Sequence, residues 1–208
     1  MTNQQLFEYL LQQYNICNNE QDFINIGIKI KELIETSDDF DIANAICVLS
    51  MPSSGLDYHN KFVVSPEWVK AQLTRDVGNV AEVAQLLNNW LPDKYSMSWA
   101  KQCIEQTHND NVALAAYLLY CNHKSFIPLA WVKQQIARGI DYVARTICWL
   151  YLNNQNEDEI NINWVKQQIK RETEGVKSIV KALYKNGDIN KEWRDQQLVK
   201  VKIIEGKL

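Results

Sequence analysis

Trp68-Val69-Lys70-Ala71-Gln72-Leu73 is the most informative stretch of this chain, because close copies of it follow at regular spacing. The copies read WAKQCI from Trp99, WVKQQI from Trp131, WVKQQI from Trp164 and WRDQQL from Trp193. The steps between successive tryptophans are 31, 32, 33 and 29 residues. A period of this length is typical of helical hairpins that stack one on the next. The repeat therefore predicts an all-α fold, a right-handed α–α superhelix (solenoid) of about five helical hairpins with ~32 residues each.

Each copy is preceded by a residue suited to starting a helix. Three residues before the tryptophans lie Ser65, Ser96, Pro128, Asn161 and Asn190. The serine and asparagine side chains accept hydrogen bonds from the free amides of a first helical turn. A second apolar helix follows each first helix, and turn-forming residues close the repeat. We expect a single domain, 1–208, in these parts: a cap helix at 1–23, a degenerate repeat at 24–51, repeats at 65–95, 96–127, 128–160 and 161–189, and a half-repeat at 190–208.

This hairpin repeat resembles HEAT-like and tetratricopeptide-like helical-repeat proteins in its architecture. It departs from the tetratricopeptide Trp-x-x-Leu-Gly pattern and from the ankyrin Thr-Pro-Leu-His pattern. The resemblance implies a solenoid whose extended surface binds a protein or a peptide. It extends to small HEAT-like alkylpurine DNA glycosylases, which would need a basic concave surface.

The glutamine four residues after the tryptophan is the unexpected member of the repeat. At 100° per residue it falls between the tryptophan and the following valine, where an unpaired buried amide would cost roughly 1–3 kcal/mol. Two interpretations stay open for these residues. In the first, the glutamines form a ladder that bonds to the backbone or the indole N–H groups of the adjacent hairpin. In the second, tryptophans and glutamines line an open groove. The repeat signature comprises Trp68, Trp99, Trp131, Trp164, Trp193, Gln72, Gln135, Gln168 and Gln197.

Cationic side chains recur on the same helices. The lysine two residues after the tryptophan is expected to be solvated. The position seven residues after it is cationic in four of five copies, and either its stem packs on the indole or it forms a basic stripe for an acidic partner. The candidate partner-binding residues are Arg75, Arg138, Arg171, Lys200, Gln134 and Gln167.

Charge is unevenly distributed over the 208 residues. The net charge is −3, which does not favour nucleic acid as a partner. Residues 1–60 nevertheless hold two Lys/Arg and nine Asp/Glu, whereas residues 166–208 hold eleven Lys/Arg and six Asp/Glu. The five cysteines form no CxxC pair and are expected to be reduced. With neither a signal-peptide pattern nor a membrane-spanning apolar run, the chain is predicted to be cytoplasmic.

No catalytic, cofactor-binding or metal-ligating motif is visible, so the chain is predicted not to be an enzyme and to need no cofactor. The favoured function is a protein- or peptide-binding module, such as a bacterial adaptor or a toxin-immunity protein. The alternative is a nucleic-acid-binding, DNA-glycosylase-like protein that uses the basic C-terminal repeats, with Trp164 and Trp193 exposed for stacking. A third possibility is a head-to-tail oligomer that joins the acidic and basic ends.

Overall fold

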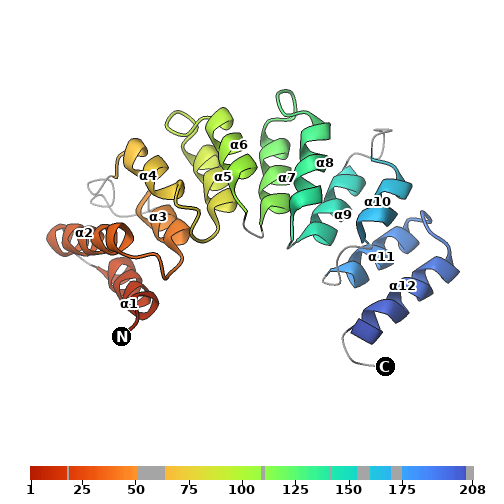
Figure 1. Cartoon of the computed structure of the whole chain (residues 1–208), viewed down its shortest axis with the longest axis horizontal. Helices are drawn as coiled ribbons and strands as arrows, with labels where there is room; N and C mark the ends of the chain where they lie inside the picture. The colour runs from red at the N-terminus through yellow and green to blue at the C-terminus, as the bar shows by residue number, and fades with distance from the viewer. Residues whose placement is uncertain are drawn as a thin grey trace. The chain divides into compact units, whose positions relative to one another are not determined.

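The computed structural model confirms an all-α fold (Figure 1). The structure describes residues 1–17, 19–50, 64–108, 111–140, 142–153, 160–169 and 175–204, with side chains up to residue 201. Every regular element within these ranges is a helix. No helix of the described part is both long enough and apolar enough to cross a bilayer.

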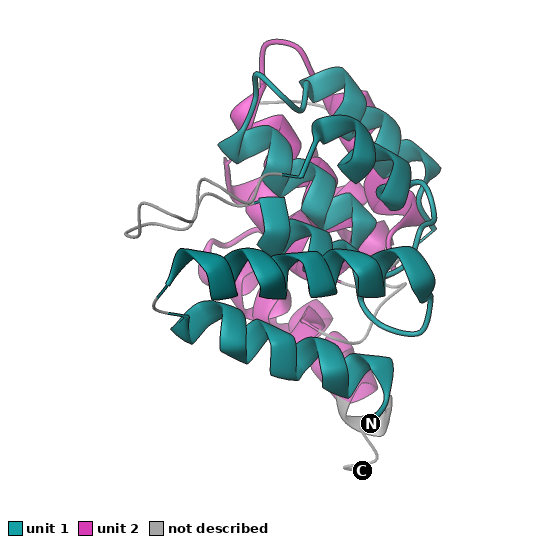
Figure 2. Cartoon of the chain, turned by 90° about the vertical axis from the view of Figure 1, so that its left-hand side faces the viewer, with its two compact units in different colours: residues 1–109 teal, residues 110–208 magenta. Residues whose placement is uncertain are grey.

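The chain divides into two compact units, Met1–Asn109 and Asp110–Leu208 (Figure 2). The first unit contains α1 (Asn3–Ile16), α2 (Glu20–Thr36), α3 (Ile42–Ser50), α4 (Pro66–Leu73), α5 (Val80–Trp90) and α6 (Met97–Gln106). The second unit contains α7 (Val112–Asn122), α8 (Leu129–Arg138), α9 (Val143–Asn153), α10 (Ile162–Ile169), α11 (Val176–Lys185) and α12 (Lys191–Ile204). The boundary between the units lies inside the predicted repeat 96–127.

The predicted capping residues start the tryptophan-bearing helices, which are α4, α6, α8, α10 and α12. The Trp68 amide donates to the Ser65 hydroxyl at 3.2 Å, and the Trp99 amide donates to Ser96 over the same distance. The amides of Trp164 and Trp193 donate to the side chains of the asparagines three residues earlier, at 3.0 and 2.8 Å. Pro128 has no side-chain acceptor, and there the Trp131 amide donates to the Pro128 carbonyl oxygen at 3.0 Å. The tryptophan follows the capping residue by three positions because its amide donates the hydrogen bond that the cap accepts.

The apolar stripes predicted for both helices of a repeat are buried. On α4, α6, α8 and α10, the residues one and five positions after the tryptophan are almost inaccessible, as Val132 and Ile136 in α8 illustrate. In α12 the corresponding residues, Arg194 and Leu198, are only half-buried. On α9, Val143, Ile147 and Leu150 are likewise enclosed. Burial of these stripes is the main favourable contribution to the fold.

Helices that follow one another in the chain pack in pairs, which are α1–α2, α3–α4, α5–α6, α7–α8, α9–α10 and α11–α12. In each of the last five pairs the tryptophan helix comes second, so the predicted boundaries at 96, 128, 161 and 190 fall within pairs. A buried amide supports this pairing in the first unit, where Asn88 Nδ2 of α5 donates to the Tyr95 carbonyl oxygen at 2.8 Å, just before α6. The odd-numbered helices also adjoin one another, α3 with α5 in the first unit and α9 with both α7 and α11 in the second.

Candidate binding surfaces

The repeated lysine lies over the tryptophan of the next copy. Lys133 Nζ is 5.4 Å from the ring centroid of Trp164, and Lys166 Nζ is 5.3 Å from that of Trp193. In the first unit, Lys70 Nζ is 5.8 Å from the Trp99 centroid. The prediction of solvated lysines was wrong, because these side chains are half-buried and a neighbouring helix supplies the ring. Each contact is a cation–π interaction between consecutive tryptophan helices, worth about 0.5–1 kcal/mol at such partly exposed sites.

Arg75, a predicted partner-binding residue, is occupied within its own unit. Its guanidinium donates to the carbonyl oxygens of Ile34 and Ser37 at the end of α2, and it forms an ion pair with Asp38. It also donates to Gln72 Oε1 at 2.9 Å. A cation at a helix C-terminus satisfies carbonyl groups that have no partner within the helix. Arg75 therefore links α4 to α2.

In two copies, the glutamine of the repeat pairs with the arginine three residues later. Gln135, which is only 2% exposed, accepts a hydrogen bond from Arg138 Nη1 at 2.5 Å, as Gln72 does from Arg75. The Trp68 indole has a different partner, since Trp68 Nε1 donates to Glu35 Oε1 at 2.7 Å. These two glutamine bonds run to an arginine three residues away and not to the adjacent hairpin, as the ladder interpretation requires, so the choice between ladder and groove stays a prediction; at Arg75 the arginine itself carries the link to the neighbouring helix.

The other predicted binding residues have different surroundings. Gln134, Gln167 and Lys200 are exposed, as is Arg138 despite its bond to Gln135. Arg171 lies outside the described residues. The role of these residues in partner binding stays a prediction.

The two tryptophans expected as exposed stacking platforms are not exposed. Trp164 and Trp193 are half-buried, and each has a lysine over its ring. Trp131 is only 8% exposed. The expectation of exposed indoles was wrong because the neighbouring tryptophan helix covers part of each ring.

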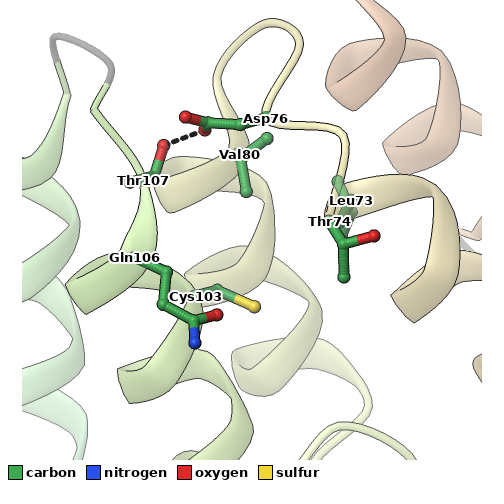
Figure 3. Close-up of a pocket in the computed structure, with 7 residues that line it drawn as sticks. All are labelled: Leu73, Thr74, Asp76, Val80, Cys103, Gln106 and Thr107. Carbon is green, nitrogen blue, oxygen red and sulfur yellow. Dashed lines mark hydrogen bonds between the residues drawn. The ribbon is translucent and has the colours of Figure 1, made fainter.

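A small pocket in the first unit brings polar side chains together (Figure 3). It measures about 80 Å³ and is lined by Leu73, Thr74, Asp76, Val80, Cys103, Gln106 and Thr107. The Asp76 carboxylate accepts hydrogen bonds from the Thr107 hydroxyl and, at 3.2 Å, from the His108 amide. These bonds tie the connection after α4 to the end of α6.

Burial of the Cys103 thiol and the small volume of the pocket limit the reactions that it could support. Burial raises the pKa of the Cys103 thiol to about 11, an effect only partly offset by the charge of Lys70. The thiol is therefore protonated at neutral pH and is a poor nucleophile. The volume accommodates water rather than a cofactor. Within the described ranges, no group of three His, Cys, Asp or Glu side chains is arranged to hold a metal ion.

An exposed aromatic surface lies along α9 of the second unit, where it rests on the buried Tyr117 of α7. Tyr142, Trp149 and Leu152 are 43%, 37% and 39% exposed, and Arg145 is also exposed. Arg145, Trp149 and Leu152 lie three, seven and ten residues after Tyr142, so the four residues share one face of α9. We call Tyr117, Tyr142, Arg145, Trp149 and Leu152 the aromatic patch.

Ring contacts hold the aromatic patch in place. The Arg145 guanidinium carbon is 5.6 Å from the Tyr142 centroid and 5.9 Å from the Trp149 centroid. Trp149 stacks on Tyr117 of α7, with centroids 6.0 Å apart and ring planes 29° apart. Asn153 Nδ2 donates to the Tyr117 hydroxyl at 3.0 Å. Burial is the main cause that raises the pKa of Tyr117 to about 12, so its phenol stays neutral.

Sequence analysis missed the aromatic patch, although a signal was present. The buried stripe of α9 contains Val143, Ile147 and Leu150, so Arg145 and Trp149 had to project from the opposite side. The predicted signature comprised only the repeated tryptophans, and Trp149 does not belong to that series. Only the packing of α7 beside α9 shows that Trp149 rests on Tyr117.

No family model, curated protein or solved structure matches this chain. Its function is therefore inferred from its own surfaces.

Proposed function

We propose that this chain is a right-handed α–α solenoid that acts as a non-catalytic protein-binding module, with the aromatic patch as its docking site. The observation that carries the proposal is the exposed Arg145 guanidinium between two exposed rings. Tryptophan, tyrosine and arginine are the residue types enriched where protein interfaces have most of their binding energy. An adaptor or a toxin-immunity protein would use such a surface.

The chemistry of the patch defines the partner segment. Its exposed rings and Leu152 offer apolar contact, and Arg145 is its only charged member. Among the described residues, no carboxylate forms an ion pair with Arg145. A partner segment with bulky apolar side chains next to an Asp or Glu would cover the rings and pair with the guanidinium. An amphipathic helix of the partner is one form that suits a helical surface.

Selection of displayed random peptides against the full chain tests this proposal. We expect wild-type protein to enrich peptides that combine bulky apolar residues with an acidic one. Arg145→Glu should shift the selection toward basic peptides, because the reversed charge repels carboxylates. Trp149→Ala should weaken binding of the wild-type peptides at least tenfold, a change of about 1.4 kcal/mol.

The matched controls are Gln134→Ala and Gln167→Ala on the tryptophan helices. Both residues are exposed, so neither change should affect folding or peptide binding. If these two changes abolish binding while Arg145→Glu leaves the selected peptides unchanged, the docking site lies on the tryptophan helices and the aromatic patch is not the site.

A further inference from the structure

Three positions recur on the same flank of α7, α9 and α11. Counted from the valine that starts each helix, they are the second, sixth and ninth residues. At 100° per residue they lie within a sector of about 60°. In α7 these residues are Ala113, Tyr117 and Tyr120, and all three are buried.

The same flank of α9 is also covered. Its residues are Ala144, Cys148 and Tyr151, of which only Cys148 is more than 9% exposed. The following odd-numbered helix adjoins each of these helices, and on the flank of α7 it contributes Trp149, which stacks on Tyr117. The approach is close where that helix begins, since a Cβ built on Gly175 would lie 3.5 Å from the Ala144 Cβ.

On α11 this flank holds Lys177, Lys181 and Tyr184. No helix follows α11 in the odd-numbered series of the described chain, and all three side chains are exposed, Tyr184 by 38%. Arg194 of α12 lies over the Tyr184 ring at 4.1 Å and is paired with Asp195. We call Lys177, Lys181, Tyr184 and the adjoining exposed Lys185 the cationic flank.

The cationic flank has a strong local charge in a chain that is acidic on average. Every charged residue of α7, α9 and α11 is cationic. Within the described residues, the three lysines of the flank form no ion pair with a carboxylate. The nearest acids in sequence are Glu174, which lies outside the described residues, and Asp188, which is half-buried; on α12, Glu192 is exposed and Asp195 pairs with Arg194. The flank therefore presents exposed ammonium groups to a binding partner.

We infer that the cationic flank binds the phosphate backbone of single-stranded nucleic acid, a function separate from protein binding at the aromatic patch. Lysine is depleted at protein–protein interfaces, whereas ammonium groups are suited to neutralising phosphates. Tyr184 adds a ring on which a base can stack. A membrane surface is disfavoured, because α11 exposes no Trp, Phe or Leu side chain that could insert among lipids.

Fluorescence anisotropy of a labelled oligothymidine tests this inference on the full chain. We expect binding at low salt that weakens as salt is raised. The double variant Lys177→Glu/Lys181→Glu should bind at least tenfold more weakly. Loss of two phosphate contacts should also make the slope of log K against log salt shallower by about 1.4, at about 0.7 per contact for single strands. Tyr184→Ala should weaken binding with the slope unchanged.

The matched control is Lys29→Glu/Lys94→Glu, which changes the net charge equally at two exposed lysines of the first unit. It should retain most of the affinity. The inference is overturned by absence of binding at low salt, by equal weakening in both double variants, or by poly-glutamate binding as tightly as the oligonucleotide. Binding to anionic lipid vesicles without binding to the oligonucleotide would also overturn it.

Discussion

Tyr142 has a backbone conformation that its side chain disfavours. Its φ is +56°, in the left-handed region, whereas the residue at the same place before α11 is Gly175, with φ +77°. A bulky residue held there costs on the order of 1–3 kcal/mol. The Tyr142 ring contacts the Arg145 guanidinium, so the strained position places one ring of the proposed docking site.

Substitutions at Tyr142 should separate stability from binding. Tyr142→Gly and Tyr142→Ala both remove the ring, and both should weaken peptide binding. The glycine variant should be the more stable of the two by about 1 kcal/mol, because alanine keeps the left-handed strain. Denaturant unfolding measures the difference. An alanine variant as stable as the glycine variant would show that the backbone relaxes and that the tyrosine is not strained.

At the scale of the helix, the same position has opposite surroundings in neighbouring copies. Ala144 of α9 is 1% exposed beside Gly175, whereas Lys177 of α11 is exposed. The helices start alike, and the difference comes from the presence or absence of a following odd-numbered helix. This contrast explains how one repeat pattern accommodates alanine in the interior of the second unit and lysine near its end.

Exchanging these residues tests whether the flank of α9 is covered. Ala144→Lys should lower the free energy of unfolding by more than about 3 kcal/mol, because it forces a long charged side chain into a closed contact. Lys177→Ala should change it by less than about 0.5 kcal/mol. Urea unfolding followed by circular dichroism measures both changes. If Ala144→Lys has no effect, α11 does not pack on this flank, and the definition of the cationic flank fails with it.

At the scale of the whole molecule, the proposed solenoid has a measurable consequence. A compact globular chain of this length has a radius of gyration of about 17 Å. Stacked hairpins extend in one direction, so small-angle X-ray scattering of the monomer should give a clearly larger value. Light scattering on the same sample fixes the monomer mass. A radius near the compact value would rule out the extended superhelix while leaving the helix pairs unchanged.

Several features of the fold could be predicted because they depend on residues close in sequence. Ser65 and Ser96 cap helices three residues before a tryptophan, and this hydrogen bond needs only the local backbone. The buried stripe of α9 follows from helical periodicity. In contrast, Arg75 finds its acceptors at Ile34 and Ser37, and such distant contacts leave no periodic trace in the sequence.

The proposed docking site was not predicted from the sequence, whereas the repeated cations and glutamines were, and their surroundings differ from the expected ones. The lysine two residues after each of the first four repeated tryptophans points away from the stripe of its own helix, which suggested full solvation. The structure instead places Lys133 and Lys166 over the rings of neighbouring copies. A helical wheel describes one helix, so it cannot include a ring that a second helix provides.

Local sequence was enough to establish that the chain is helical, where most of its described helices begin and which stripes are buried, because caps and periodicity act within a few turns of backbone. Tertiary packing was needed to show that each tryptophan helix pairs with the helix before it. It was also needed to show that Trp149 stacks on Tyr117 and that Arg145 contacts the Tyr142 ring while both Trp149 and Arg145 stay exposed. The exposure of the lysines on α11 likewise depends on packing. Those outcomes depend on which helix lies beside which, and contacts between residues far apart in the chain set that arrangement.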